Sequence, residues 1–416
     1  MAAFHIEGEN KLNGEARVSA AKNAVLPVMA AALLTAEPVT IERPPRLSDV
    51  SHMAGILRDM GCQVEWGERQ MRITASNPGG CPKQADVRAL RASILVLGPM
   101  LARTGSAEVA LPGGCAIGNR PIDLHIKGLA QMGAQVECEA GRVTARGRLQ
   151  GCSIFLDLPS VGATENLMMA ACLAKDVTRI ENAAREPEVV ELARCLNRMG
   201  GKVRGAGSSR VEIEGVPALH GADLKIIPDR IEAGTLLCAL GAAGGEIVLK
   251  NVYAPALSAV IEKLGQMGLS IRSERSRLMA SGKVSRPVQL STGAFPGFPT
   301  DLQAPMMALA AMSPGDSLLV ESVFENRFMH AQELTRMGAN IHIEGRSALV
   351  KGGALAGAEV CATDLRAGAA LVVAALGARG ESVVERAELI DRGYEGLEKK
   401  LGRMGAKVTR TQSAEG

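Results

Sequence analysis

The chain has 416 residues, enough for two ordinary domains that each bury a core. Its net charge of +3 and its 2% aromatic content argue against general attraction to nucleic acid or membranes and against base stacking. No apolar stretch reaches the roughly 20 residues that span a bilayer, and the N-terminus lacks the pattern of a signal peptide. We therefore expect a cytoplasmic protein with no nucleic-acid or membrane partner.

A Met-Gly pair recurs six times along the chain, whereas composition alone predicts about two such pairs. Successive glycines are 72, 67, 68, 70 and 67 residues apart. An amphipathic run precedes each pair, and a β-branched residue lies three positions after each glycine. The pattern predicts a helix, a glycine with positive φ at its end, and then a strand. The six pairs begin at Met60, Met132, Met199, Met267, Met337 and Met404.

A second, more apolar helix is predicted upstream of each pair, and a short strand follows each of these helices. The repeating unit is therefore helix, strand, helix, strand, turn, strand, with the first helix buried. The apolar segments, in chain order, are 22–34, 88–101, 163–174, 229–243, 300–312 and 364–378.

The sixth unit ends before its last strands, and the N-terminal sequence resembles the strands that close the third unit. We therefore expect the N-terminus to complete the last unit. The predicted fold class is α/β, with six βαβαββ repeats, three in each of two domains. One domain spans 21–226, and the other combines 1–20 with 227–416. The two crossings would form a two-stranded hinge that suits closure around a ligand.

Cations stand at the expected helix starts, where the helix dipole disfavours them. Surface solvation explains any one of them, but it is a weak explanation for so many equivalent positions. Together with free helix N–H groups they predict sites for phosphate and carboxylate. Asp229 and Asp364, in contrast, suit ordinary helix N-caps. The cations are Lys22, Arg88, Arg91, Arg120, Arg327, Arg366 and Arg392.

The segment 111–125, LPGGCAIGNRPIDLH, differs from its counterparts in the other units. Its glycines indicate a loop that enters a helix, with Cys115 near Arg120 and the helix start. Both would favour the thiolate, so we predict a reactive thiol that serves as acid or nucleophile. The alternative, a packed small hydrophobe, is our interpretation of Cys62, Cys138, Cys172, Cys195 and Cys238.

Asp301 follows two prolines at another expected helix start, in the segment FPTD. It could serve as an N-cap, or it could accept a hydroxyl proton in an arginine-lined cleft. The nine cysteines contain no CxxC pair, the histidines show no ligand spacing, and nucleotide-binding glycine motifs are absent. We expect neither a metal nor a cofactor.

With these residues the chain resembles the enolpyruvyl transferases over essentially its whole length. The resemblance implies a two-domain inside-out α/β barrel, in agreement with the repeat. The matching motifs are AKNAVLP (21–27), PGGCAIGNRPIDLH (112–125), PSVGATEN (159–166), FPTDLQAP (298–305), FENRFMH (324–330), TDLRAGAAL (363–371) and DRGYE (391–395).

The activity that the resemblance implies is transfer of the enolpyruvyl group of phosphoenolpyruvate to the 3-hydroxyl of UDP-N-acetylglucosamine, with release of phosphate. This is the first committed step of peptidoglycan synthesis, and it passes through a tetrahedral phosphorylated ketal. Two alternatives stay open: the shikimate-pathway branch of the family, and a non-catalytic repeat protein that binds UDP-sugars. The oligomeric state also stays open.

The resemblance further implies roles for individual residues. Lys22, Arg120 and Arg392 would hold phosphoenolpyruvate. Asp301 would be the base, and Cys115 would be the acid and the target of fosfomycin. Arg327, Asp364 and Arg366 would organise the substrates and closure. Contacts to the UDP-sugar would come from Asn23, Arg91, Arg120, Pro121, Ile122, Asp123, Leu124, Ser160, Val161, Gly162 and Val323.

Overall fold

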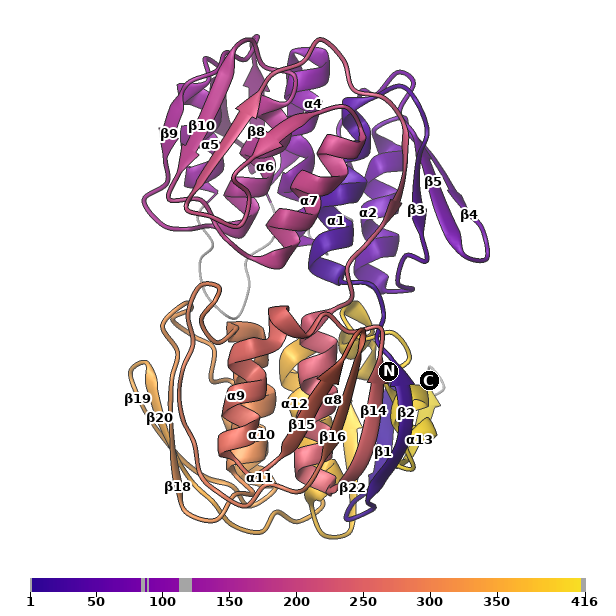
Figure 1. The fold of residues 1–416 in the computed structure, drawn as a ribbon, viewed down its shortest axis with the longest axis vertical. Helices are drawn as coiled ribbons and strands as arrows, with labels where there is room; N and C mark the ends of the chain where they lie inside the picture. Colours follow the sequence, from indigo (N-terminus) through magenta and orange to yellow (C-terminus); the bar gives the residue numbers. More distant parts are fainter. Residues whose placement is uncertain (1, 84–86, 88–89, 112–121, 413–416) are drawn as a thin grey trace. The chain divides into compact units, whose positions relative to one another are not determined.

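The computed structural model describes residues 2–83, 87, 90–111 and 122–412 (Figure 1). These residues form two compact α/β units. The N-terminal unit consists of the described residues of 20–227. The C-terminal unit combines those of 1–19 and 228–416. Each unit has its own hydrophobic core.

The N-terminal unit passes three times through one order of elements, which is helix, strand, helix and then further strands. The first pass contains α1 (Lys22–Ala31), η1 (Ala32–Leu34), β3 (Val39–Glu42), α2 (Ser48–Asp59), β4 (Gln63–Trp66) and β5 (Gln70–Thr74). The second contains η2 (Arg91–Val96), α4 (Leu97–Thr104), β6 (Ser106–Ala110), α5 (Asp123–Gln131), β7 (Gln135–Glu139), β8 (Arg142–Arg146) and β9 (Ser153–Phe155). The third contains α6 (Val161–Ala171), β10 (Val177–Glu181), α7 (Pro187–Arg198), β11 (Lys202–Arg204), β12 (Arg210–Glu214) and β13 (Ala222–Lys225).

The C-terminal unit repeats the same order and ends in the N-terminal strands. Its first pass contains α8 (Arg230–Ala243), β14 (Gly245–Lys250), η3 (Ala254–Leu257), α9 (Ser258–Gln266), β15 (Ser270–Glu274), β16 (Arg277–Ser281) and β17 (Gln289–Ser291). Its second contains η4 (Thr300–Leu302), α10 (Gln303–Ala310), β18 (Asp316–Val320), α11 (His330–Arg336), β19 (Asn340–Glu344), β20 (Ser347–Lys351) and β21 (Glu359–Cys361). Its third contains α12 (Leu365–Gly377), β22 (Glu381–Glu385), η5 (Ala387–Arg392), α13 (Leu397–Arg403), β23 (Lys407–Gln412), β1 (Ala2–Glu7) and β2 (Leu12–Arg17).

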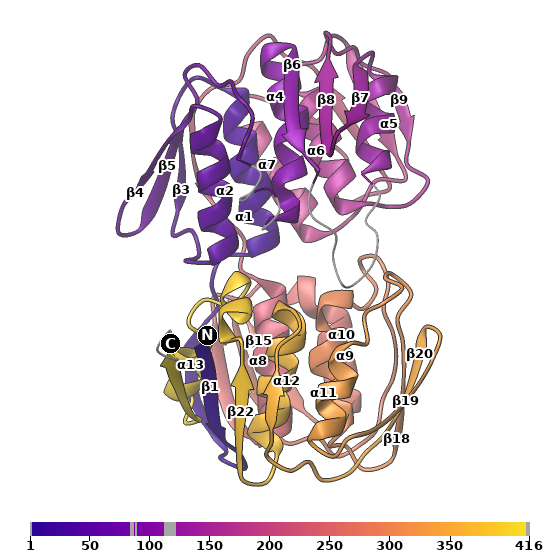
Figure 2. The ribbon, with the colours of Figure 1, turned by 180° about the vertical axis from the view of Figure 1, so that it is seen from behind.

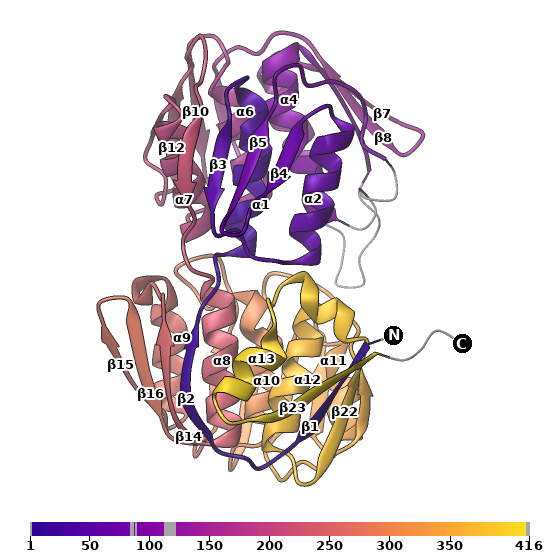
Figure 3. The ribbon, with the colours of Figure 1, turned by 90° about the vertical axis from the view of Figure 1, so that its right-hand side faces the viewer.

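The N-terminal strands complete the last repeat, as the sequence predicts. β1 pairs antiparallel with both β22 and β23, and β2 runs parallel to β14 with Leu12 opposite Gly245. Figure 3 shows these N-terminal strands among elements from the other end of the chain. Residues almost 400 positions apart therefore share one sheet, and the prediction is confirmed.

Strand pairing also links successive repeats. In the C-terminal unit the closing strand of each repeat runs parallel to the first strand of another, through the pairs β17–β18, β21–β22 and β2–β14. The N-terminal unit has the corresponding pairs β9–β10 and β13–β3. Its described residues also form the three-stranded sheet β6-β8-β7, seen in Figure 2. In each unit the closing strand of the last repeat therefore pairs with the first strand of the first repeat.

The Met-Gly pairs lie where the sequence places them. All six glycines have φ between 82° and 106°, a left-handed conformation that costs glycine little. Each follows a methionine that caps the preceding helix, as Met60 caps α2. This geometry turns the chain from helix to strand in every repeat.

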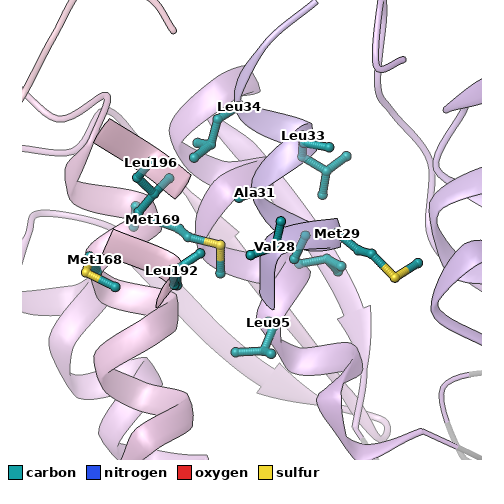
Figure 4. Packing of buried hydrophobic residues seen from close by; sticks show 14 of the residues in the cluster. Val28, Met29, Ala31, Leu33, Leu34, Leu95, Met168, Met169, Leu192 and Leu196 are labelled. Carbon is teal, nitrogen blue, oxygen red and sulfur yellow. The ribbon is translucent and has the colours of Figure 1, made fainter. Parts of the chain in front are cut away.

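The first helix of each repeat is buried, as predicted. In α1, nine of ten residues are buried, and α8, α10 and α12 pack against one another in the other unit. Some of this packing requires glycine, because a Cβ on Gly98 of α4 would lie 2.5 Å from the backbone oxygen of Asn166 in α6. Figure 4 shows the core around Val28 and Met29 of α1.

Candidate active site

The densest group of predicted site residues lies in the C-terminal unit, around Asp301 in η4. Its Oδ1 accepts a hydrogen bond from Arg327 Nη2 at 2.6 Å, and its Oδ2 accepts one from Arg366 Nη2 at 2.9 Å. The two arginine side chains are 7% and 5% exposed, whereas that of Asp301 is 22% exposed. One partly accessible carboxylate is therefore held between two buried cations.

Arg366 is fixed from several sides. Its guanidinium lies 5.3 Å from the ring centroid of Tyr394, whose hydroxyl is hydrogen-bonded to Thr235 at 3.0 Å. Burial opposes its charge, but Asp301, Tyr394 and Asp229 outweigh that effect and raise the pKa of the guanidinium. Its buried Nη1 has no hydrogen-bond partner among the residues that the structure describes. A buried cationic donor without an acceptor is the feature of a site that receives an anionic oxygen.

Asp364 and Asp229 cap helices, as their sequence positions suggest. Asp364 Oδ1 accepts from the backbone N–H groups of Arg366 and Ala367, at 2.7 and 3.0 Å. Asp229 accepts in the same way at the start of α8. The cap of α12 therefore fixes the turn that carries Arg366. Asp301, in contrast, lies in the first turn of η4, whose N-cap is Pro299, so the N-cap interpretation of Asp301 is wrong.

Two arginines do not lie at helix N-termini, against the prediction. Arg327 precedes α11 by three residues, and Arg392 is the last residue of η5. Gly396, with φ 54°, separates η5 from α13, so the second helix of this repeat begins at Leu397 and not at Arg392. Arg327 is held by side chains instead, because its Nη1 donates to Thr300 Oγ1 at 2.8 Å.

The residue before Arg392 in the sequence, Asp391, forms a strong ion pair. Asp391 accepts two hydrogen bonds from Arg410 of β23, at 2.9 and 2.6 Å. Such a paired contact fixes orientation as well as distance. The end of η5, and with it the backbone of Arg392, is therefore tied to the last strand of the chain.

In the N-terminal unit, Lys22 is the first residue of α1, and Ala21 provides no side-chain cap. Asn23 is the next residue of the helix. The Lys22 ammonium lies 2.5 Å from Asp49 Oδ2 in α2, and both residues are buried. Sequence reasoning missed Asp49 because an acid in the first turn of a helix is an ordinary feature.

The expected contacts to the sugar nucleotide lie at two helix starts of this unit. Ile122 precedes α5, which begins with Asp123 and Leu124. Ser160 caps α6, accepting from Ala163 N at 3.3 Å, and Val161 and Gly162 form the first turn. These starts are neighbours, because a Cβ on Gly162 would lie 3.5 Å from the ring of His125.

His125 is a structural residue at this position. Its Nδ1 lies 2.9 Å from Asn166 Nδ2, and burial lowers its pKa to about 4. Neutral at physiological pH, it joins α5 to α6 and is unsuited to holding a phosphate.

Some expectations cannot be placed. Arg88, Cys115, Arg120 and Pro121 lie outside the described residues, and of Arg91 only the backbone is described, at the start of η2. Val323 is 41% exposed between β18 and α11. Within the described ranges, no group of His, Cys, Asp and Glu could hold a metal ion, and no helix is long and apolar enough to cross a membrane.

The other cysteines mostly follow the prediction. Cys62, Cys172, Cys195 and Cys238 are buried, and burial raises the pKa of each thiol. Cys138 is exposed, so its interpretation as a packed hydrophobe is wrong. It lies on β7 next to the hairpin turn at Ala140, where the strand residues face solvent.

Comparisons with known proteins agree with this architecture. A family model described as EPSP synthase (3-phosphoshikimate 1-carboxyvinyltransferase) matches residues 6–401. UDP-N-acetylglucosamine 1-carboxyvinyltransferase 2 of Carboxydothermus hydrogenoformans is 49% identical over 416 residues, which cover 99% of each chain.

Solved structures show the same fold. The enolpyruvyl transferase NikO from Streptomyces tendae matches with a TM-score of 0.89 and 25% identity, over 99% of each chain. An EPSP synthase from Acinetobacter baumannii matches with a TM-score of 0.76 and 19% identity, over 99% of this chain and 100% of that one. Because the family model and the 49% identical relative both cover nearly the whole sequence, the chain belongs to the family of enolpyruvyl (carboxyvinyl) transferases.

Proposed function

We propose that the protein transfers the enolpyruvyl group of phosphoenolpyruvate to the 3-hydroxyl of UDP-N-acetylglucosamine and releases inorganic phosphate. The observation that carries this proposal is the 49% identity, over the whole chain, with a relative named for that acceptor. The EPSP synthase of Acinetobacter baumannii is only 19% identical, so shikimate 3-phosphate is the weaker candidate acceptor. This reaction would make the protein a cytoplasmic enzyme of peptidoglycan synthesis.

The reaction proceeds by addition and elimination. The 3-hydroxyl oxygen adds to C2 of phosphoenolpyruvate, while the hydroxyl loses its proton to a base and C3 gains a proton from an acid. The resulting tetrahedral phosphorylated ketal then loses phosphate from C2 and a proton from the methyl group, which restores the vinyl double bond. In this scheme Asp301 is the base and Cys115 is the acid.

The Asp301 cluster suits a general base. Two guanidinium groups hold the carboxylate in one orientation, and the carboxylate stays partly exposed. A base needs such a fixed position relative to the hydroxyl whose proton it accepts. Arg366 Nη1 supports a role in substrate binding, since it is a buried donor without an acceptor in the described part of the chain and could serve an anionic oxygen.

Anion binding requires further cations. The two substrates together carry about four to five negative charges, and the mutual repulsion has to be offset by the protein. We assign phosphoenolpyruvate to Lys22, Arg120 and Arg392. We assign the UDP-sugar to Asn23, Arg91, Val323 and the segments 120–124 and 160–162. Ser160 and Ile122 support this assignment because each provides a helix start, where N–H groups are free for phosphate.

The architecture has a finer proposed form. We infer that each unit is an inside-out barrel, with buried helices such as α8, α10 and α12 surrounded by linked sheets. We place the domain boundaries near 20/21 and 226/227. The ring of parallel strand pairs in the C-terminal unit supports this form.

A phosphate-release assay tests the function. We expect release that requires both phosphoenolpyruvate and UDP-N-acetylglucosamine, and none when shikimate 3-phosphate replaces the sugar nucleotide. Release with shikimate 3-phosphate alone would assign the chain to the other branch. Binding of the UDP-sugar without turnover would support the non-catalytic alternative.

Asp301→Asn is the sharpest variant for the mechanism. It keeps the size of the side chain but cannot accept the hydroxyl proton, so we expect kcat to fall by about a thousandfold. Binding of UDP-N-acetylglucosamine, measured by calorimetry, should change less than tenfold, which shows that the loss is chemical. A kcat within tenfold of the wild type would remove Asp301 from the role of base.

A second variant tests the proposed role of Cys115. The Cys115→Asp variant should resist fosfomycin, because it lacks the thiol that the inhibitor would alkylate. Full sensitivity of this variant to fosfomycin would refute the thiol role.

A further inference from the structure

A buried carboxylate outside the proposed catalytic set organises the Asp301 cluster. Glu321 directly follows β18 and is 1% exposed. It forms no ion pair with another described residue. Its Oε1 accepts from Thr292 Oγ1 at 2.9 Å and from the backbone N–H groups of Val323 and Phe324 at 2.9 and 3.1 Å. Its Oε2 accepts from Thr300 Oγ1 at 2.8 Å. A buried carboxylate is costly, and here four neutral donors stabilise it.

The first route from Glu321 to the cluster runs through Thr300. A carboxylate can only accept hydrogen bonds, so the single hydroxyl hydrogen of Thr300 points to Glu321. The Thr300 oxygen then presents a lone pair to Arg327 Nη1, at 2.8 Å. The other guanidinium nitrogen, Nη2, reaches Asp301. Every donor in this chain of hydrogen bonds is therefore defined, because Glu321 fixes the direction in which the Thr300 hydroxyl donates.

The second route runs through the backbone. By holding the N–H groups of Val323 and Phe324, Glu321 fixes the start of the loop that carries Arg327. The Arg327 guanidinium lies 5.0 Å from the centroid of the Phe324 ring. Glu321 thus fixes both the turn that carries Asp301 and the loop that carries Arg327, although it reaches neither side chain directly.

We propose that Glu321 is a positioning residue for the transfer reaction, which orients Arg327 on Asp301 through Thr300 and the 323–324 backbone. The proposal rests on the proposed role of Asp301 as the base. If the proposal is correct, the protonation of Asp301 depends on Glu321, which is connected to Arg327 through two successive hydrogen bonds. Fixing Val323 in the same step links this network to the expected UDP-sugar contact.

The test compares Glu321→Gln with Thr300→Val and Thr300→Ser. The amide of glutamine brings its own hydrogens and disturbs the polarity of the chain, and valine removes the hydroxyl. For both variants we expect kcat to fall by about tenfold to a hundredfold, with the KM for phosphoenolpyruvate within about twofold. The acidic limb of the kcat–pH profile should move to higher pH, because Arg327 then stabilises the Asp301 carboxylate less. Thr300→Ser keeps the hydroxyl and should restore kcat to within about threefold of the wild type.

The control for lost stability is Ser317→Ala. Ser317 is buried at the other end of β18, where its Oγ accepts from Val288 N at 3.0 Å. This variant should lower Tm while leaving kcat and the acidic limb unchanged. If Glu321→Gln behaves like Ser317→Ala, Glu321 is merely structural and the proposal is overturned.

The double variant Glu321→Gln/Thr300→Val tests whether Glu321 and Thr300 act on Arg327 through the same route or independently. A shared pathway predicts a loss close to that of either single variant. Multiplied losses would contradict positioning through Thr300. Failure of this proposal is distinguishable from failure of the proposed function. If Asp301→Asn abolishes turnover but Glu321→Gln does not change it, only the role of Glu321 fails. If Asp301→Asn remains active, the base assignment fails, and with it the role of Glu321.

Discussion

The two units handle buried charge in opposite ways. In the C-terminal unit, Arg327 and Arg366 share one carboxylate, that of Asp301. In the N-terminal unit, Lys22 forms a close ion pair with Asp49. Planar guanidinium groups bind a carboxylate and still offer further donors, whereas the ammonium is a point charge. We therefore expect Arg366 to bind an anionic group while it still holds Asp301. Lys22, in contrast, has to loosen its contact with Asp49 when it binds an anion.

The N-terminal unit also accumulates acid near its helix starts. Glu165 of α6 is 3% exposed, and no described residue forms a hydrogen bond with its Oε1. Burial, and after it the charges of Glu188 and Glu186, raise its pKa well above the ordinary value. A protonated carboxyl is the consistent state of Glu165.

The largest effect in this comparison is expected from Arg366→Lys. Lysine keeps the charge but cannot reach Asp301, stack on Tyr394 and offer a spare donor at once. We expect kcat/KM to fall by about a hundredfold in steady-state assays. Arg179→Lys, at an exposed pair with Glu212, is the matched control and should stay within about twofold. A loss below threefold in Arg366→Lys would mean that charge alone matters there.

A smaller effect, on stability rather than turnover, is expected from Asp49→Asn. Removing one member of a buried ion pair leaves the other charge poorly compensated, which costs about 3 kcal/mol of unfolding free energy. Denaturant unfolding measures this loss. Phosphoenolpyruvate should raise Tm more in this variant than in the wild type, because the ammonium has lost this partner.

Lys22→Met/Asp49→Asn is the control for that prediction. With both charges gone, the double variant should be more stable than Asp49→Asn alone. Equal Tm gains from phosphoenolpyruvate in wild type and Asp49→Asn would show that the pair does not compete with the substrate.

The smallest effect concerns Glu165→Gln and its dependence on pH. Because the folded state raises the pKa of Glu165, the folded protein holds this proton more tightly than the unfolded chain. The stability that this proton contributes is complete below the unfolded pKa and is lost as pH rises toward the folded pKa. Glutamine mimics the protonated form at every pH. We therefore expect wild type and variant to have similar Tm near pH 4, and the variant to be the more stable at pH 8. A constant difference in Tm across that range would contradict a protonated Glu165.

Local patterns made much of the fold predictable. The Met-Gly pairs indicate helix ends because a glycine with positive φ is favourable there in any tertiary context. The capping role of Asp364 is local for the same reason, since its partners are two and three residues away. The place of Arg392 at a helix start was predicted wrongly, because nothing in the local sequence shows that a short helix ends there and that α13 begins only after Gly396.

The predicted site was recovered less evenly. Sequence reasoning identified Asp301, Arg327 and Arg366 as separate residues with possible roles. It missed Glu321 and Asp49, which look like an ordinary strand-end acid and an ordinary helix-start acid. Neither residue type nor spacing distinguishes a buried acid that organises a cluster from an exposed one.

The sequence by itself determined the repeat, the order of its elements, the buried first helices and the completion of the last repeat by the N-terminus. These follow from periodicity and from glycine geometry, which act over a few residues. Only the tertiary structure decided that Asp301 lies between arginines 26 and 65 positions further along the chain, and that Lys22 pairs with Asp49. Those contacts depend on how separate helices and loops pack, and the energy of a buried charge is set by the partners that the packing brings to it.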